Sequence, residues 1–231
     1  MIIATMQKKV SDAPVLSELH VWNDPVARDG PTNMAVDEWL WRSAEKPILR
    51  LYCWTGEWMS IGYFSRSSAV PANRNFVRRP TGGGLVDHGS DWTYTLVIPR
   101  GHELAEMRGA LSYEVIHQAL CDALGAEGIN CRLLADEDEQ SSDFCFRRPV
   151  RHDLVWHNGE KIAGAGQRRG KQGLLHQGSV QAVAKFPLQR GFAIASCLAD
   201  AVTESQVAID ETEVRRLSDE VYRLSSWNRR R

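Results

Sequence analysis

The chain has 231 residues, 43% of them hydrophobic and 25% charged, and these fractions are close to those of globular proteins, which excludes wholesale disorder. Its 28 Lys and Arg residues nearly balance its 29 Asp and Glu residues, so the chain has no overall field that would hold nucleic acid or an anionic membrane. The five cysteines form no CxxC pair, and there is no signal-peptide pattern and no long apolar run, so we expect a soluble cytoplasmic protein without a zinc site, a disulfide framework or a membrane span.

The first third of the chain contains short strand patterns and one helix pattern. Residues 18–22 alternate as a strand does. Pro31 and Thr32 open a helix that runs from about Asn33 to Ser43, with Thr32 as the candidate N-cap. The Thr55-Gly56 turn lies between two apolar runs and predicts a hairpin of strands over 48–54 and 58–63.

The rest of the chain mixes strands with helices. Apolar residues recur at helical spacing over about 111–126 and again from Val214 to Leu224. Asn158-Gly159 is the strongest short hairpin signal in the chain and predicts flanking strands over 154–156 and 161–165. Further strands are predicted over 92–98, 129–134 and 174–183, and a solvated acidic loop over 135–143. Hairpins mixed with helices, without regular β-α-β alternation, indicate an α+β domain on a largely antiparallel or mixed sheet.

The most informative stretch is Arg78-Arg79-Pro80-Thr81 followed by three consecutive glycines, Gly82 to Gly84. Glycines let backbone N–H groups approach a ligand with no Cβ in the way, and the two arginines supply cationic donors. This combination suits a carboxylate, an acyl carbonyl or a phosphate. Neither the P-loop pattern nor the dinucleotide pattern matches it. The structural alternative is a flexible turn between strands.

A second segment of interest is the predicted hairpin that places Lys161 at the start of a strand. Ala163, Gly164, Ala165 and Gly166 follow it and leave one strand face almost bare. Glycines in a strand often mark a place where a ligand or another backbone comes close. The alternative is an exposed lysine on a sheet edge, which is the commoner environment of a single lysine.

Four motifs, in the right order, resemble the biotin/lipoate protein ligase and octanoyltransferase superfamily. Residues 33–38 resemble its first helix and residues 60–64 its early strand. Residues 78–84, with His88 after them, look like its Arg-Arg-x-Ser/Thr-Gly-Gly-Gly motif, and residues 159–164 look like its lysine motif. The resemblance covers about residues 18–183. We therefore expect residues 1–17 to form an N-terminal extension and residues 18–231 to form a single catalytic domain of this type.

The resemblance implies an α+β fold with a central mixed, largely antiparallel sheet flanked by helices, of the biotinyl/lipoyl transferase type that is related to class II synthetases. It also implies a tunnel for a medium-chain acyl group, with Lys161 as a catalytic residue that binds the carbonyl or carboxyl oxygen. The residues that would contact the acyl head group or line the site are Arg79, Thr81, Gly82, Gly83, Gly84, His88, Gly164, Gln167 and His176.

Cys145 is the residue that separates the branches of this superfamily. Its ligases use ATP, whereas its transferases pass the acyl group through a cysteine thioester. Residues 143–146, with Pro149 and Asp153 after them, resemble the cysteine loop of the octanoyltransferase and lipoyl amidotransferase branch. Cys145 is then the nucleophile, and neighbouring arginines would lower its pKa. The alternative is a small buried thiol between two phenylalanines.

Three functions follow from these motifs. The first is a cysteine acyltransferase that needs no cofactor. It would move an octanoyl or lipoyl group from an acyl carrier protein or a lipoylated donor to a lysine of a lipoyl-domain acceptor, such as the glycine cleavage H protein or the acyltransferase subunit of a 2-oxoacid dehydrogenase. The second is a lipoate–protein ligase that uses ATP and Mg²⁺ to form lipoyl adenylate, and the third is a non-catalytic acyl-binding relative. None of them needs nucleic acid or a membrane.

Some residues depart from the family pattern or need no function. Gly89 stands where relatives often carry an Asp directly after the histidine. We expect the other cysteines to be core residues, and His152 and His157 to lie on the surface. These cysteines are Cys53, Cys121, Cys131 and Cys197.

Overall fold

The computed structural model describes residues 14–135, 150–181, 183 and 188–230. Within these ranges an eight-stranded sheet has the order β11-β1-β2-β6-β10-β9-β8-β7. Strand β1 pairs in parallel with β11 and with β2, and every other neighbouring pair is antiparallel. The strands are β1 (Leu16–Asn23), β2 (Ile48–Tyr52), β6 (Trp92–Pro99), β7 (Cys131–Leu133), β8 (Leu154–Trp156), β9 (Lys161–Gly170), β10 (Gly173–Val180) and β11 (Ala199–Glu204). This mixed, largely antiparallel sheet confirms the predicted α+β class.

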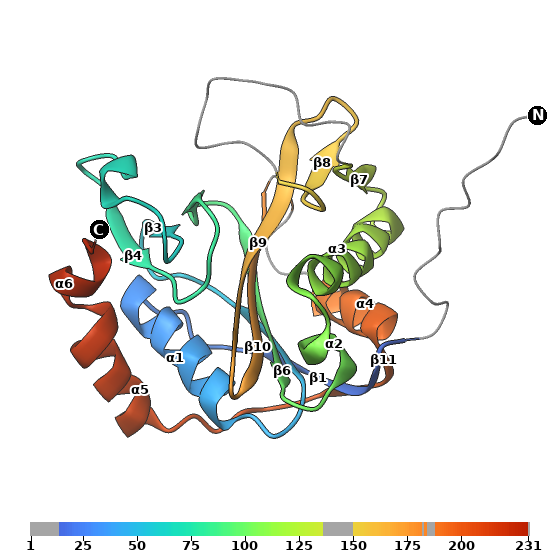
Figure 1. The fold of residues 1–231 in the computed structure, drawn as a ribbon, viewed down its shortest axis with the longest axis horizontal. Helices are drawn as coiled ribbons and strands as arrows, with labels where there is room; N and C mark the ends of the chain where they lie inside the picture. Colours follow the sequence, from blue (N-terminus) through green and yellow to red (C-terminus); the bar gives the residue numbers. More distant parts are fainter. Residues whose placement is uncertain (1–13, 136–149, 182, 184–187, 231) are drawn as a thin grey trace, which may run out of the picture.

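Helices cover both faces of the sheet (Figure 1). On one face lie α2 (Glu103–Glu106), α3 (Gly109–Ala126) and α4 (Leu188–Leu198), and on the other lie α1 (Gly30–Ser43) and α5 (Glu211–Leu217). The last of these continues into a π-helical turn over Ser218–Tyr222 and then α6 (Ser225–Asn228). Each face therefore has its own apolar cluster, and the central strands β6 and β10 are buried along their whole length.

A second, three-stranded sheet lies beside α1 and corrects one prediction. It consists of β3 (Trp58–Ile61), β4 (Asn75–Arg78) and β5 (Leu85–Asp87), with a short 3-10 turn over Ser67–Ala69 between β3 and β4. The hairpin predicted over 48–63 is wrong, because β2 pairs with β1 and β6 whereas β3 pairs with β4 and β5. A turn does form there, with Gly56 at a φ of +80°, but it carries the chain from one sheet to the other.

The helix boundaries differ from the sequence prediction at two places. The first helix begins at Gly30, and its N-cap is Asp29, whose carboxylate accepts the backbone N–H of Thr32. Thr32 is therefore not the cap. At the C-terminal end, Val214 and Leu217 are buried as predicted, but Leu224 lies beyond the π-helical turn and is 43% exposed. No helix in the described ranges is long and apolar enough to cross a membrane.

The hairpin predicted at Asn158-Gly159 is confirmed, and it positions the candidate site. Strands β8 and β9 pair in antiparallel register on either side of the turn. Strand β9 runs on to Gly170, beyond the predicted end, because β10 pairs with its residues 163–170. Since β8 is much shorter, the part of β9 that follows Ala163 has no β8 residue opposite it.

Candidate functional site

The glycine loop, residues 79–84 between β4 and β5, packs directly against β9. The N–H of Gly82 donates to the carbonyl of Gln167 over 3.4 Å. A Cβ on Gly166 would lie 2.3 Å from the carbonyl oxygen of Gly82, and a Cβ on Gly62 would lie 2.0 Å from that of Gly83. Only glycine allows these contacts, so the bare strand face predicted from the sequence is covered by the backbone of the loop.

Arg79 lies beneath this loop and holds it from the inside. Its Nη1 donates to Ser60 Oγ over 2.7 Å, and its Nη2 donates to the carbonyls of Gly82 and Gly84 over 3.0 Å each. These partners are neutral oxygens, and burial lowers the pKa of Arg79 to about 10. The guanidinium therefore donates its hydrogen bonds to groups that fix the shape of the loop.

His88 joins the same network through Ser60. Its Nε2 lies 2.6 Å from Ser60 Oγ, its Nδ1 lies 2.8 Å from Asp91 Oδ2, and the ring stacks on Trp54 with centroids 3.9 Å apart. Burial alone would raise the pKa of Asp91, but the charge and hydrogen bond of His88 outweigh it and hold that pKa below its ordinary value. Asp91 thus places a carboxylate against His88, two residues beyond Gly89.

Ser60, His88 and Asp91 have the mutual spacing of a hydrolytic triad, but they cannot act as one here. Ser60 is completely buried, and its oxygen already accepts a hydrogen bond from Arg79. A nucleophile needs an open path to its substrate. The three residues therefore form a support for the glycine loop.

Arg78, the first arginine of the motif, ties the loop after β3 to the C-terminal helix. Its Nη1 donates to the carbonyls of Gly62, Tyr63 and Ser65, and its other nitrogens donate to the carbonyls of Trp227, Asn228 and Arg230. Arg78 was expected to supply a cationic donor for a ligand, whereas its guanidinium donates to backbone carbonyls. Carbonyls from such distant segments carry no sequence signal, so a local pattern does not reveal this contact.

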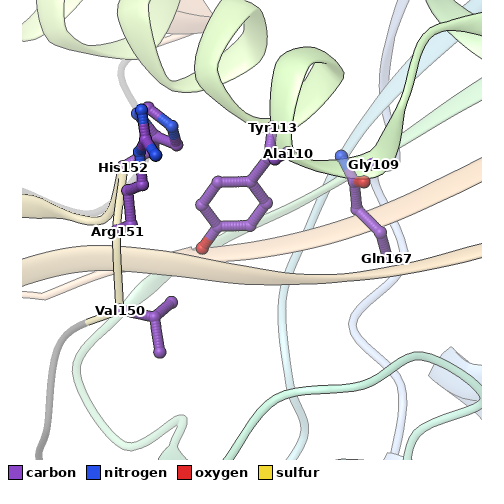
Figure 2. Close-up of a pocket in the computed structure, with 7 residues that line it drawn as sticks. All are labelled: Gly109, Ala110, Tyr113, Val150, Arg151, His152 and Gln167. Atoms are coloured by element: carbon purple, nitrogen blue, oxygen red, sulfur yellow. The ribbon is translucent and has the colours of Figure 1, made fainter. Parts of the chain in front are cut away.

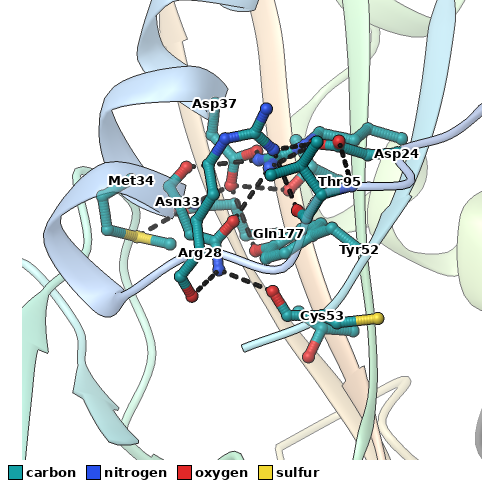
Figure 3. Close-up of polar contacts among 12 residues, drawn as sticks. Asp24, Arg28, Asn33, Met34, Asp37, Tyr52, Cys53, Thr95 and Gln177 are labelled. Atoms are coloured by element: carbon teal, nitrogen blue, oxygen red, sulfur yellow. Dashed lines mark hydrogen bonds and ion pairs between the residues drawn. The ribbon is translucent and has the colours of Figure 1, made fainter. Parts of the chain in front are cut away.

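Thr81 connects the glycine loop to a buried polar network that includes Gln177 and Asp37, both labelled in Figure 3. Its hydroxyl donates to Gln177 Oε1 over 2.7 Å, and Gln177 Nε2 donates to Asp37 Oδ2 over the same distance. Asp37 in turn pairs with Arg50 at 2.6 Å, and Arg50 pairs with Asp24 at 2.8 Å. The first-helix motif therefore anchors the loop to the sheet through a chain of satisfied buried groups.

Lys161 lies across the hairpin from a buried carboxylate. Its Nζ donates to Asp153 Oδ2 over 2.6 Å, while the hydroxyl of Tyr113 donates to Asp153 Oδ1 over 2.5 Å. Tyr113 also accepts the N–H of Ala165 over 2.9 Å, in the part of β9 that has no β8 residue opposite it. The Lys161 side chain is 36% exposed and that of Asp153 is fully buried, so one end of this ion pair is open to solvent.

Gly164 makes the position of the lysine possible. A Cβ at Gly164 would lie 2.4 Å from Lys161 Nζ and 2.9 Å from Asp153 Oδ1. Any larger residue would push the ammonium group off the strand. Gly164 and Gly166 thus share one face of β9, where Gly164 leaves room for the lysine and Gly166 leaves room for the glycine loop.

Gln167 and His176 lie deeper, on the α3 side of the sheet. Gln167 Nε2 is 3.1 Å from His176 Nδ1, and His176 Nε2 is 3.2 Å from the hydroxyl of Tyr94. Burial holds the pKa of His176 well below its ordinary value, so the ring is neutral. His117 lies beside it, with a pKa lowered by burial to about 4, and its Nε2 has no hydrogen-bond partner among the described residues.

A pocket of about 270 Å³ opens next to Tyr113 (Figure 2). The first turn of α3 and the residues that precede β8 form its walls, and Tyr113 projects between them towards β9. Its lining residues are Gly109, Ala110, Tyr113, Val150, Arg151, His152 and Gln167. The structure therefore places the pocket, the lysine and the glycine loop along one strand.

Several predictions about single residues have a clear outcome. His152 is buried, which corrects its expected surface position, while His157 is exposed as predicted. Cys197 is exposed and does not belong to the core, because it lies on the outer face of α4. Cys145 and the loop predicted over 135–143 lie outside the described residues, except for Ala135.

Comparison with known proteins gives a consistent result. A family model described as the lipoyl protein ligase A/B catalytic domain matches residues 29–226. The chain is 30% identical over 216 residues to octanoyltransferase LipM of Geobacillus kaustophilus, covering 78% of this chain and 77% of that protein. It is 31% identical over 167 residues to octanoyltransferase LipM of Bacillus subtilis, covering 64% of this chain and 60% of that protein.

A solved structure shares the fold. It is described as a bi-partite lipoate protein ligase and its E2 lipoyl domain from Thermoplasma acidophilum. The match has a TM-score of 0.68 at 19% identity, and it covers 93% of this chain and 96% of the other.

Proposed function

Since the chain belongs to the lipoyl protein ligase A/B catalytic-domain family, as its motifs predicted, we propose that it is an octanoyltransferase of protein lipoylation. Its similarity to two proteins named octanoyltransferase LipM supports this reaction. The structural observation that carries the proposal is the position of Lys161. Its half-open ammonium group lies against Gly164 on β9, the strand that also meets the glycine loop at Gly166 and the pocket at Gln167.

The proposed reaction has two transfers through Cys145. The Cys145 thiolate attacks the acyl carbonyl of a donor thioester, so that a new C–S bond forms, the donor C–S bond breaks and the donor thiolate leaves. The ε-amine of an acceptor lysine then attacks the enzyme thioester. The amide bond forms, the Cys145 thiolate is released, and the proton lost by the amine returns to that thiolate. No ATP is consumed, because the donor is already a thioester.

Chain connectivity supports Cys145 as the nucleophile. Val150 lines the pocket and follows Cys145 by five residues, and five residues of extended chain span at most about 18 Å. The N–H of Val150 also donates to Asp153 Oδ2 over 2.7 Å, on the same carboxylate oxygen that pairs with Lys161. The Asp153 carboxylate therefore binds both Lys161 and the backbone of Val150, which follows Cys145 in the chain.

Lys161 has the chemistry of an oxyanion donor in both transfers. Its ammonium group carries three N–H donors, one of which is bound to Asp153, so that others are free to meet a developing negative charge. The donor in this proposal is an acylated carrier protein and the acceptor is a lipoyl domain. The name of the solved relative, which includes a lipoyl domain, supports the acceptor class.

The thioester is tested by intact mass. We expect incubation with octanoyl carrier protein to give an octanoyl adduct that hydroxylamine removes, and Cys145→Ser to abolish it. The matched control Cys197→Ser, at an exposed cysteine on α4, keeps the adduct. Absence of an adduct, together with ATP-dependent attachment of free lipoate, would assign the ligase reaction instead. Binding of acyl groups without any turnover would assign a non-catalytic role.

The lysine is tested by the rate of adduct formation. Lys161→Met removes the proposed oxyanion donor and is expected to lower the acylation rate by about 100-fold. Lys171→Met, in the exposed turn between β9 and β10, is the matched control and keeps the wild-type rate. Equal rates for the two variants would remove Lys161 from the reaction.

A further inference from the structure

Two cysteines far from the glycine loop lie in direct contact. Cys121 is on the C-terminal half of α3, and Cys131 is the first residue of β7. Their Sγ atoms are 3.7 Å apart, and the Cys121 thiol also reaches the backbone carbonyl of Cys131 at 3.3 Å. Both residues are half-buried, so the pair is packed against the core and still reachable from solvent.

The two thiols differ in acidity in the way that a reactive pair requires. The hydrogen bond from Cys131 lowers the pKa of Cys121, although burial and the nearby Asp122 carboxylate oppose it. The same contact, with burial and Asp122, raises the pKa of Cys131. Cys121 is therefore the thiol that ionises first, and Cys131 remains the protonated partner.

We propose that Cys121 and Cys131 form a reversible disulfide site that reacts with small-molecule disulfides of the glutathione type. The Cys121 thiolate attacks one sulfur of the reagent, forms a mixed disulfide and expels one thiolate. Cys131 loses its proton and attacks the Cys121 sulfur, which forms the internal disulfide and expels the second thiolate. The cysteines lose two electrons in total and the reagent gains them.

The geometry needs little change for this step. A disulfide has an S–S length of about 2 Å, so the sulfur atoms approach by less than 2 Å from their 3.7 Å separation. The bond would close a short loop, residues 121–131, and tie the end of α3 to β7. Strand β7 pairs with β8, which begins directly after Asp153. The cross-link therefore joins α3, which carries Tyr113, to the sheet edge next to Asp153, the hydrogen-bond partner of Tyr113. It lies at the end of α3 that is away from the pocket.

The experiment uses the full chain and oxidised glutathione. The native protein is incubated with the reagent, its remaining thiols are blocked with an alkylating agent, and peptide mapping identifies which cysteines are joined. We expect a Cys121–Cys131 disulfide that dithiothreitol reverses, and a melting temperature higher by roughly 5 °C in the oxidised form. The site depends on no step of the proposed acyl transfer, so acylation assays neither support nor oppose it.

Serine variants assign the two roles. In Cys131→Ser we expect the reaction to stop at a glutathione adduct on Cys121, whereas Cys121→Ser loses both the adduct and the disulfide. Cys197→Ser and Cys53→Ser are the matched controls and form the disulfide like the wild type. A disulfide that joins Cys121 or Cys131 to any other cysteine, or a stable adduct on wild-type Cys121 without closure, would overturn the proposal. The mapping of the wild type alone decides this even where a variant does not fold.

Discussion

The two sides of the candidate site are held in opposite ways. The glycine loop is closed. Arg79 is buried and donates to neutral oxygens, His88 is buried between Ser60 and the Asp91 carboxylate, and the backbone of the loop fits against two glycines. The lysine side is half open, since one buried carboxylate holds an ammonium group that solvent still reaches. The contrast indicates that the arginine motif shapes the site, whereas the lysine hairpin presents the group that we propose to act in acyl transfer.

The largest expected effect comes from Arg79 on the closed side. Arg79→Met leaves Ser60 Oγ and two backbone carbonyls without their donor and is expected to lower the free energy of unfolding by about 3 kcal/mol. Arg74→Met, which breaks an exposed pair with Asp87, is the control and should cost less than about 1 kcal/mol. Chemical denaturation measures both. Equal losses would mean that the guanidinium does not support the loop.

The next effect tests the fit of the loop backbone. Gly62→Ala puts a Cβ 2.0 Å from the carbonyl oxygen of Gly83, and we expect a loss of about 2 kcal/mol in unfolding free energy. Gly84→Ala is the matched control, because a Cβ there meets nothing within 4 Å, and its change should stay within about 0.5 kcal/mol. The reverse order of the two variants would show that the loop takes another conformation.

The open side is expected to depend on pH through the histidines behind it. The pKa of His117 in the folded protein is about 4, below its ordinary value of 6.5, because burial disfavours the charged ring. Protons then bind the unfolded chain first, so stability is full above pH 6.5 and falls towards pH 4. At pH 5.5 the loss from this group is about 1.4 kcal/mol. His117→Gln should flatten the pH dependence of unfolding, and exposed His157→Gln should leave it unchanged.

The smallest effect distinguishes positioning from support on the lysine side. Tyr113→Phe removes one hydrogen bond to Asp153 and one from the N–H of Ala165, and is expected to slow acylation about fivefold, equivalent to about 1 kcal/mol. Tyr63→Phe, on the closed side, is the control and should keep the wild-type rate. The measurement is the single-turnover rate of adduct formation. A Tyr113→Phe enzyme as fast as the control would place Tyr113 outside the positioning of Lys161.

The sequence predicts what is local and misses what depends on distant partners. The α+β class, helix α3 and the hairpin at Asn158-Gly159 all follow from patterns within a few residues, and all are confirmed. The hairpin at Thr55-Gly56 is wrong because a turn signal does not say which sheet the next strand joins. Strand β11 has no alternating apolar pattern to reveal it, since most of its residues are exposed and it adds to the edge of the sheet beside β1.

The site shows the same division. The motifs predicted that the glycine loop and Lys161 belong to one site. The bare face of β9 predicted the close approach of another backbone. The direction in which a side chain points can be predicted only once the fold is known. Nothing near Arg79 in the sequence shows that its side chain turns inward to Ser60. The Asp91 carboxylate is a related case, because only the fold shows that it reaches Nδ1 of His88.

The face shared by Gly164 and Gly166 also limits how the gene can change in length. Side chains alternate between the two faces of a strand, so inserting or deleting one residue between Gly164 and Gly166 would turn the lysine contact and the loop contact to opposite sides of β9. Insertions in the turn at Asn158-Gly159 do not shift the pairing of β9 with β10. Homologous chains of this type should therefore vary in the length of that turn and keep the spacing from Gly164 to Gly166 constant.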